Sequence, residues 1–178
     1  MLRDCRSRRA YVRLNPPSKV EYREATIADV PAMALCRATD AVAGPADDRM
    51  VAYFEGRHHP HQALAARIGY VAVADSVVIG YIAGHETRRL DCKGEVQYLY
   101  VTPEYRRQGV GTTLLEHLAQ WFRVRGAATV CVNVNIDSPP AAPFYLSCGA
   151  LPINAHWYFW PDISAVLDSE NRQTRPAS

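Results

Sequence analysis

The chain has 178 residues, of which 48% are hydrophobic and 21% are charged. That length and composition are typical of a single globular domain with its own core. The net charge is only +2, which does not favour nucleic acid as a partner of the whole protein.

Cysteine spacing and hydropathy exclude further classes. Five cysteines are scattered without a C-x-x-C pair, which favours reduced thiols in the cytosol over a disulfide framework or a zinc site. No apolar run is long enough to span a membrane. Arginines near the N-terminus are not followed by the apolar block of a secretory signal. We therefore expect a cytoplasmic protein without membrane contact.

Composition along the chain predicts three segments. Residues 1–19 form a basic arm that ends after Pro16-Pro17, and residues 169–178 form a tail. Residues 20–168 are predicted to be one domain. The arm leaves open an alternative in which it binds an acidic partner such as RNA or DNA.

The first half of the domain predicts a strand and two helices. Residues 20–25 read as a strand, and Thr26 followed by Asp29 resembles a capping box that begins a helix. Gly44-Pro45 interrupts the helical pattern, and a second helix is expected from Asp47 to about Arg57. The histidines at 58, 59 and 61 are interpreted as a solvated loop rather than a metal site, because Pro60 splits them.

The second half alternates between strands and helices. Strands are predicted at 70–74 and 77–83 around an Asp75-Ser76 turn, then at 95–101 and 129–135, with two short strands in 150–160. Helices are predicted from Val110 to Arg125, from Ala141 to Cys148 and near 163–167. The helix beginning at Val110 carries an apolar stripe that should face the sheet, made of Val110, Leu114, Leu118 and Phe122.

The segment between the strand at 95–101 and the long helix predicts an anion site. Arg106-Arg107-Gln108-Gly109-Val110-Gly111 lies directly at the helix start. The first N–H groups of a helix lack intrahelical partners, and the helix dipole favours negative charge there. A tight turn with solvated arginines is the simpler alternative. A Walker loop and a dinucleotide fingerprint do not fit, because the required lysine and third glycine are absent.

Arg106-x-x-Gly109-x-Gly111 behind a Tyr-Leu-Tyr-Val strand resembles the acyl-CoA pyrophosphate loop of the GNAT superfamily of N-acetyltransferases. The resemblance implies an α/β (α+β) fold with a mixed, mostly antiparallel central sheet flanked by helices. It also implies acetyl-CoA as cosubstrate, held at Leu99, Tyr100, Val101, Arg106, Arg107, Gln108, Gly109, Val110, Gly111, Thr112, Asn135 and Tyr145. The Val101 N–H is the expected donor to the thioester oxygen.

Tyr145 is the candidate general acid. It lies in Pro143-Phe144-Tyr145-Leu146-Ser147-Cys148-Gly149-Ala150, which resembles a family element whose tyrosine reaches the cofactor sulfur. A core tyrosine on a short helix is the alternative. The family often has Asn where Ser138 stands, so Asn135 is the substitute contact to the pantetheine.

Glu95 is the candidate base, eleven residues before Arg106, as in histone-type members of the superfamily. A period of two places Glu95, Gln97, Leu99 and Val101 on one face of the strand. An unperturbed glutamate is a poor base for an ammonium, so burial or a water chain must assist it. His85 is a rival base, and a solvated carboxylate is the alternative interpretation of Glu95.

These patterns predict an enzyme that moves an acetyl group from acetyl-CoA to a primary amine by direct transfer in a ternary complex. A non-catalytic acyl-CoA-binding module is the alternative. The acceptor is a small-molecule or peptide amine that the sequence does not identify. A homodimer stays open.

Overall fold

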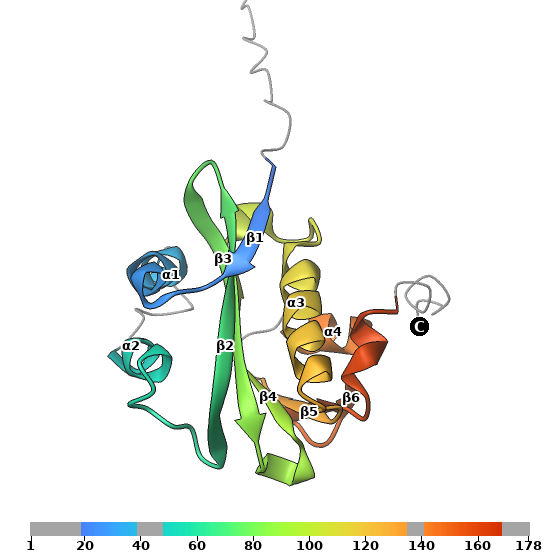
Figure 1. The fold of residues 1–178 in the computed structure, drawn as a ribbon. Coiled ribbons are helices and arrows are strands. Elements are labelled where there is room, and N and C mark those ends of the chain that lie inside the picture. The colour runs from blue at the N-terminus through green and yellow to red at the C-terminus, as the bar shows by residue number, and fades with distance from the viewer. Residues whose placement is uncertain (1–18, 39–47, 135–140, 169–178) are drawn as a thin grey trace, which may run out of the picture.

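A seven-stranded sheet organises the protein (Figure 1), whose computed structural model describes residues 19–38, 48–134 and 141–168. The strand order is β1-β2-β3-β4-β5-β7-β6. Strands β4 and β5 run parallel, and each of the other paired neighbours is antiparallel. The expected mixed, mostly antiparallel sheet is therefore confirmed. The basic arm up to residue 18, the Gly44-Pro45 break and the tail lie outside the described residues.

The elements follow the expected order. The strands are β1 (Glu21–Glu24), β2 (Ala63–Ala74), β3 (Val77–Thr87), β4 (Gly94–Val101), β5 (Val130–Asn133), β6 (Leu151–Pro152) and β7 (Trp157–Trp160). The α-helices are α1 (Val30–Ala38), α2 (Asp48–Phe54), α3 (Val110–Val124) and α4 (Ala141–Ser147). Short 3₁₀ turns occupy Ile27–Asp29, Arg89–Asp91, Pro103–Tyr105 and Ile163–Val166. Within the described ranges, no helix is both long and apolar enough to cross a membrane.

The predicted capping box forms at the start of the first helical segment. The Thr26 N–H donates to Asp29 Oδ2 at 2.8 Å, and the Thr26 hydroxyl donates to the same oxygen at 3.0 Å. Arg23 adds a two-pronged ion pair to this carboxylate, at 2.6 and 2.9 Å. These bonds satisfy helix-terminal groups and fix the direction in which the chain leaves β1 for α1.

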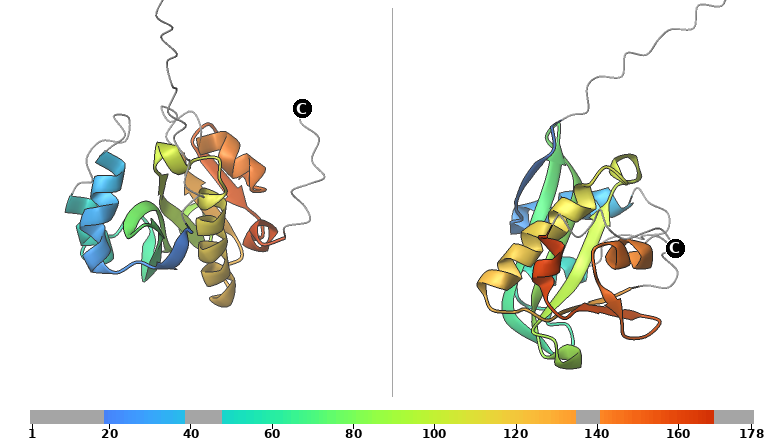
Figure 2. Two further views of the ribbon diagram at one scale, coloured as in Figure 1. Left: turned by 90° about the horizontal axis from the view of Figure 1, so that it is seen from above. Right: turned by 90° about the vertical axis from the view of Figure 1, so that its right-hand side faces the viewer.

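Helices cover both faces of the sheet: α1 and α2 on one, α3 and α4 on the other (Figure 2). The predicted stripe of α3 is confirmed, because all four of its residues are buried. Gly94 and Gly84 let the helix approach the strands closely. A Cβ atom at Gly94 would lie 2.5 Å from Cε1 of Phe122, and one at Gly84 would lie 3.0 Å from Cζ of the same ring.

Strands β2 and β3 are longer than predicted, whereas α2 is shorter. The Asp75-Ser76 turn forms as expected, with φ of 48° and 65°. The β2–β3 pairing then continues to Arg67↔His85 and Ala63↔Thr87. The extension carries Gly69, Gly84 and the polar residues Arg67 and His85, which interrupt the strand pattern. Gly69 lies against Phe54 of α2, and Gly84 lies against Leu118 and Phe122 of α3. The extension brings His85 and Thr87 alongside the start of β4.

Candidate active site

The turn between β4 and α3 has the backbone geometry that the sequence predicts for an anion site. Arg107 and Gly109 have positive φ values of 60° and 84°. The first intrahelical bond runs from the Thr113 N–H to the Gly109 carbonyl at 2.9 Å. The amides of residues 110–112 therefore belong to the helix end whose N–H groups have no carbonyl one turn earlier. Such amides and the helix dipole together favour a bound phosphate.

The two arginines of this turn differ in their contacts. Arg106 Nε donates to the Val101 carbonyl at 2.9 Å, and its guanidinium carbon lies 5.5 Å from the centre of the Tyr100 ring. Arg106 thus ties the turn to the end of β4, while the Arg107 side chain is exposed. The Gln108 side chain donates to the Glu104 carbonyl at 2.7 Å and braces the same turn.

Strand β4 diverges from β5 beside this turn. The two strands pair at Gly94↔Val130, Glu95↔Cys131 and Val96↔Val132, and the described pairing goes no further. On the other side of β4, the Thr102 N–H donates to the Ile79 carbonyl at 2.9 Å. Because hydrogen-bonded and non-hydrogen-bonded pairs alternate between antiparallel strands, the amides of Leu99 and Val101 face away from β3. They face the β5 side of β4, along the part of the strand that the described pairing with β5 does not reach, so an extended ligand could pair with them.

A β-bulge at Gln97 overturns one sequence prediction. Across β3 and β4, Ala83 lies opposite Tyr98 but Gly84 lies opposite Val96, so Gln97 is an extra residue. A bulge reverses the alternation of side chains beyond it. Leu99 and Val101 therefore share the α3 face with Val96, while Tyr98 and Tyr100 pack on the α1 and α2 face. The predicted common face of Glu95, Gln97, Leu99 and Val101 is wrong.

Tyr145 on α4 is buried, and aromatic neighbours hold its ring. Trp160 lies edge-to-face at 5.8 Å between ring centroids, and Phe144 at 5.2 Å. Phe144 in turn borders α3 and the end of β4, since a Cβ atom at Gly111 would lie 3.5 Å from the Phe144 ring and 3.7 Å from Val101. Burial raises the pKa of the Tyr145 hydroxyl well above its usual value. The phenol therefore keeps its proton and can donate it.

Glu95 is buried at the start of β4 rather than solvated. Its Oε2 accepts from Arg89 Nε at 3.1 Å and from the Thr87 hydroxyl at 3.3 Å. His85 Nε2 lies 3.5 Å from the same oxygen. The two candidate bases of the sequence therefore lie side by side, because the β3–β4 register places His85 directly opposite Glu95.

Three residues of this site carried no clear sequence signal. Arg89 and Thr87 both bind Glu95. Tyr53 contacts His85 through its hydroxyl, 3.1 Å from Nδ1. Only the paired strand ends and α2 bring these positions together, so a reading of local patterns misses them. Asn135, the expected pantetheine contact, lies outside the described residues.

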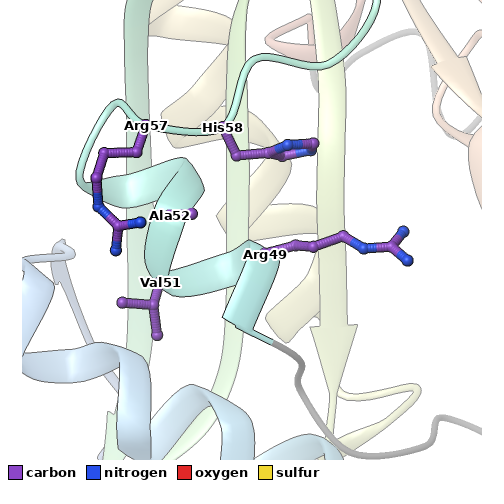
Figure 3. Close-up of a pocket in the computed structure, with 5 residues that line it drawn as sticks. All are labelled: Arg49, Val51, Ala52, Arg57 and His58. Carbon is purple, nitrogen blue, oxygen red and sulfur yellow. The ribbon is translucent and has the colours of Figure 1, made fainter.

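An open pocket of about 490 Å³ lies at α2. Its lining is basic, with Arg49, Arg57 and His58 beside Val51 and Ala52. Arg49 and His58 extend to one side and Arg57 and Val51 to the other (Figure 3). Arg67 connects this pocket to the residues around Glu95. It donates to the carbonyl of His58, which lines the pocket, and to the carbonyl of Tyr53, whose side chain contacts His85. In the described part of the chain, His, Cys, Asp and Glu side chains form no group of three that could hold a metal ion.

The fold agrees with a family match. The sequence model of the Acetyltransferase (GNAT) family matches residues 34–150, and the chain belongs to this family. The chain is also 43% identical over 49 residues to the [Ribosomal protein bS18]-alanine N-acetyltransferase of Escherichia coli strain K12. That match covers 28% of this chain and only 33% of the relative.

Solved structures share the fold at low sequence identity. A GNAT-family acetyltransferase from Desulfovibrio desulfuricans has a TM-score of 0.67 and 15% identity, covering 82% of this chain and 99% of its own. The PaiA N-acetyltransferase of Thermoplasma acidophilum, in complex with coenzyme A, has a TM-score of 0.59 and 19% identity, covering 81% and 99%. These likenesses show the fold alone.

Proposed function

We propose that the protein transfers an acetyl group from acetyl-CoA to a primary amine, directly within a ternary complex. One observation carries the proposal. Strand β4 continues beyond its described pairing with β5, beside a helix N-terminus whose first amides have no intrahelical partner. A diphosphate would bind residues 106–112, and an extended pantetheine would pair with Leu99 and Val101. The four cysteines of the described residues are buried and form no disulfide, which fits a reducing compartment, and we assign the protein to the cytoplasm.

The side chains divide the chemistry between them. As the amine attacks, the carbonyl oxygen of the thioester gains negative charge, which the Val101 N–H stabilises. Tyr145 keeps its proton because it is buried, and it donates that proton to the departing thiolate. Glu95 draws the proton from the attacking amine, directly or through water.

The acceptor is a peptide or small-molecule amine. The relative from Escherichia coli acts, by its name, on an alanine of a ribosomal protein, which makes a protein N-terminus one candidate.

The test is an amine panel assayed by release of free thiol from acetyl-CoA. The panel contains a peptide with an N-terminal alanine, the same peptide N-acetylated as control, polyamines and aminoglycosides. Release with a free amine and not with the blocked peptide is the expected result. Binding of coenzyme A without thiol release from any amine would favour the non-catalytic module instead.

Tyr145→Phe separates acid catalysis from cofactor binding. The substitution removes one hydroxyl and keeps the ring packed on Trp160, so the affinity for coenzyme A should stay within about twofold. Turnover should fall by roughly 10²-fold or more, the usual contribution of a positioned acid. Unchanged turnover would remove Tyr145 from the mechanism.

A further inference from the structure

A buried polar cluster lies behind Glu95, on the α2 side of the sheet. Tyr53 and His85 are both 0% exposed, and Glu95 is 4% exposed. Buried polar groups normally have hydrogen-bond partners. Yet His85 Nε2 is buried without one among the residues described, although Glu95 Oε2 lies 3.5 Å away.

The other ring nitrogen of His85 is fixed. Nδ1 lies 3.1 Å from the Tyr53 hydroxyl, and the two rings pack edge-to-face at 5.8 Å. Burial raises the pKa of Tyr53 well above its usual value, so the phenol stays neutral. A ring hydrogen on Nδ1, donated to the Tyr53 oxygen, leaves the Nε2 lone pair facing Glu95, whereas donation from the Tyr53 hydroxyl to Nδ1 would put the ring hydrogen on Nε2.

Charged and aromatic groups pack around the cluster. Arg89 and Thr87 both bind Glu95 Oε2. From β2, Arg67 lies opposite His85, and its guanidinium carbon lies 4.8 Å from the Tyr53 ring centre. From β4, the Tyr98 ring packs on Tyr53 at 5.5 Å. Glu95 is the anion next to the imidazole.

We propose that His85 is a positioning residue for Glu95 that stores the proton taken from the acceptor amine. This rests on the proposed acetyl transfer. The N–H bond of the ammonium breaks, Glu95 relays that proton, and an N–H bond forms at His85 Nε2. The products are a neutral amine and an imidazolium beside a carboxylate.

The first test does not depend on activity. Nitrogen-15 spectra of the labelled protein between pH 5 and 9 follow each histidine ring, and His85→Gln identifies the His85 signals. We expect neutral His85 to carry its hydrogen on Nδ1 and to gain a proton within this range. Glu95→Gln removes the neighbouring anion, 3.5 Å from Nε2, and should move the His85 titration to lower pH. His117→Gln on α3 is the control and should leave the His85 titration unchanged.

The second test uses turnover. His85→Gln should lower kcat by about 100-fold and leave the affinity for coenzyme A unchanged, whereas His117→Gln should match the wild type. A His85 ring that stays neutral throughout, an identical titration in Glu95→Gln, or wild-type kcat in His85→Gln would each overturn the proposal. If no amine is acetylated but the titrations are coupled, the proposed function fails and the shared proton site stands.

Discussion

Gly109 and Gly111, which are separated by Val110, should differ in how substitution by alanine changes the stability of the protein. Gly109 has a φ of 84°, and a left-handed conformation costs an alanine about 1–2 kcal/mol. Nothing lies within 4 Å of its Cβ position, so this strain is the whole folded-state effect. Stiffening of the unfolded chain returns about 0.4–1 kcal/mol. Gly109→Ala should therefore lower the free energy of unfolding by about 1 kcal/mol.

Gly111 is the matched control. It lies inside α3 without a positive φ, and its Cβ would make ordinary contacts at 3.5 Å with Phe144 and 3.7 Å with Val101. Gly111→Ala should be neutral or stabilise the protein by up to about 1 kcal/mol, because alanine favours a helix.

The same pair tests the phosphate site. The left-handed turn is the form that aims the helix amides at a diphosphate, and its strain in Gly109→Ala is counted once. If the variant keeps the turn, the strain lowers the free energy of unfolding and the Kd for coenzyme A is unchanged. If the turn relaxes, that stability is regained and binding must restore the strain, so about 1–2 kcal/mol appears as a roughly 5- to 30-fold weaker Kd. Gly111→Ala should bind within about twofold of the wild type. Urea unfolding and calorimetric titration measure the two quantities. Equal loss of affinity in both variants, or a Gly109→Ala variant in which neither stability nor affinity falls, would refute the reasoning.

Two further predictions concern stability. Gly94→Ala places a Cβ 2.5 Å from the Phe122 ring and should destabilise the protein by about 1–3 kcal/mol. In a Phe122→Leu background this loss of stability should be smaller. Equal losses in both backgrounds would contradict the contact. Bonds from Arg23 and the Thr26 N–H hold the pKa of Asp29 well below its usual value, so the ionised carboxylate stabilises the folded state. That stabilisation is complete above the unfolded pKa of about 3.9 and is lost as pH falls from there through the lower pKa of the folded state. Asp29→Asn should therefore cost about 1 kcal/mol in urea unfolding at pH 7 and much less at pH 2, and a cost independent of pH would count against the ion pair.

Local sequence determined the elements whose signals are contained within one segment. The apolar stripe of α3, the capping box at Thr26 and the Asp75-Ser76 turn all form as predicted. In each case the residues that interact are within a few positions of one another, so backbone preference and side-chain period suffice.

Tertiary structure decided how the candidate site is assembled. No local pattern announces the extra residue at Gln97, because a bulge is defined by the register of the partner strand. That bulge sends Glu95 and Leu99 to opposite faces. The meeting of Tyr53, His85 and Glu95 likewise depends on the packing of α2 over a strand pair. Side-chain chemistry can be read along a chain, but the proximity of groups distant in sequence is created only when the strands pair.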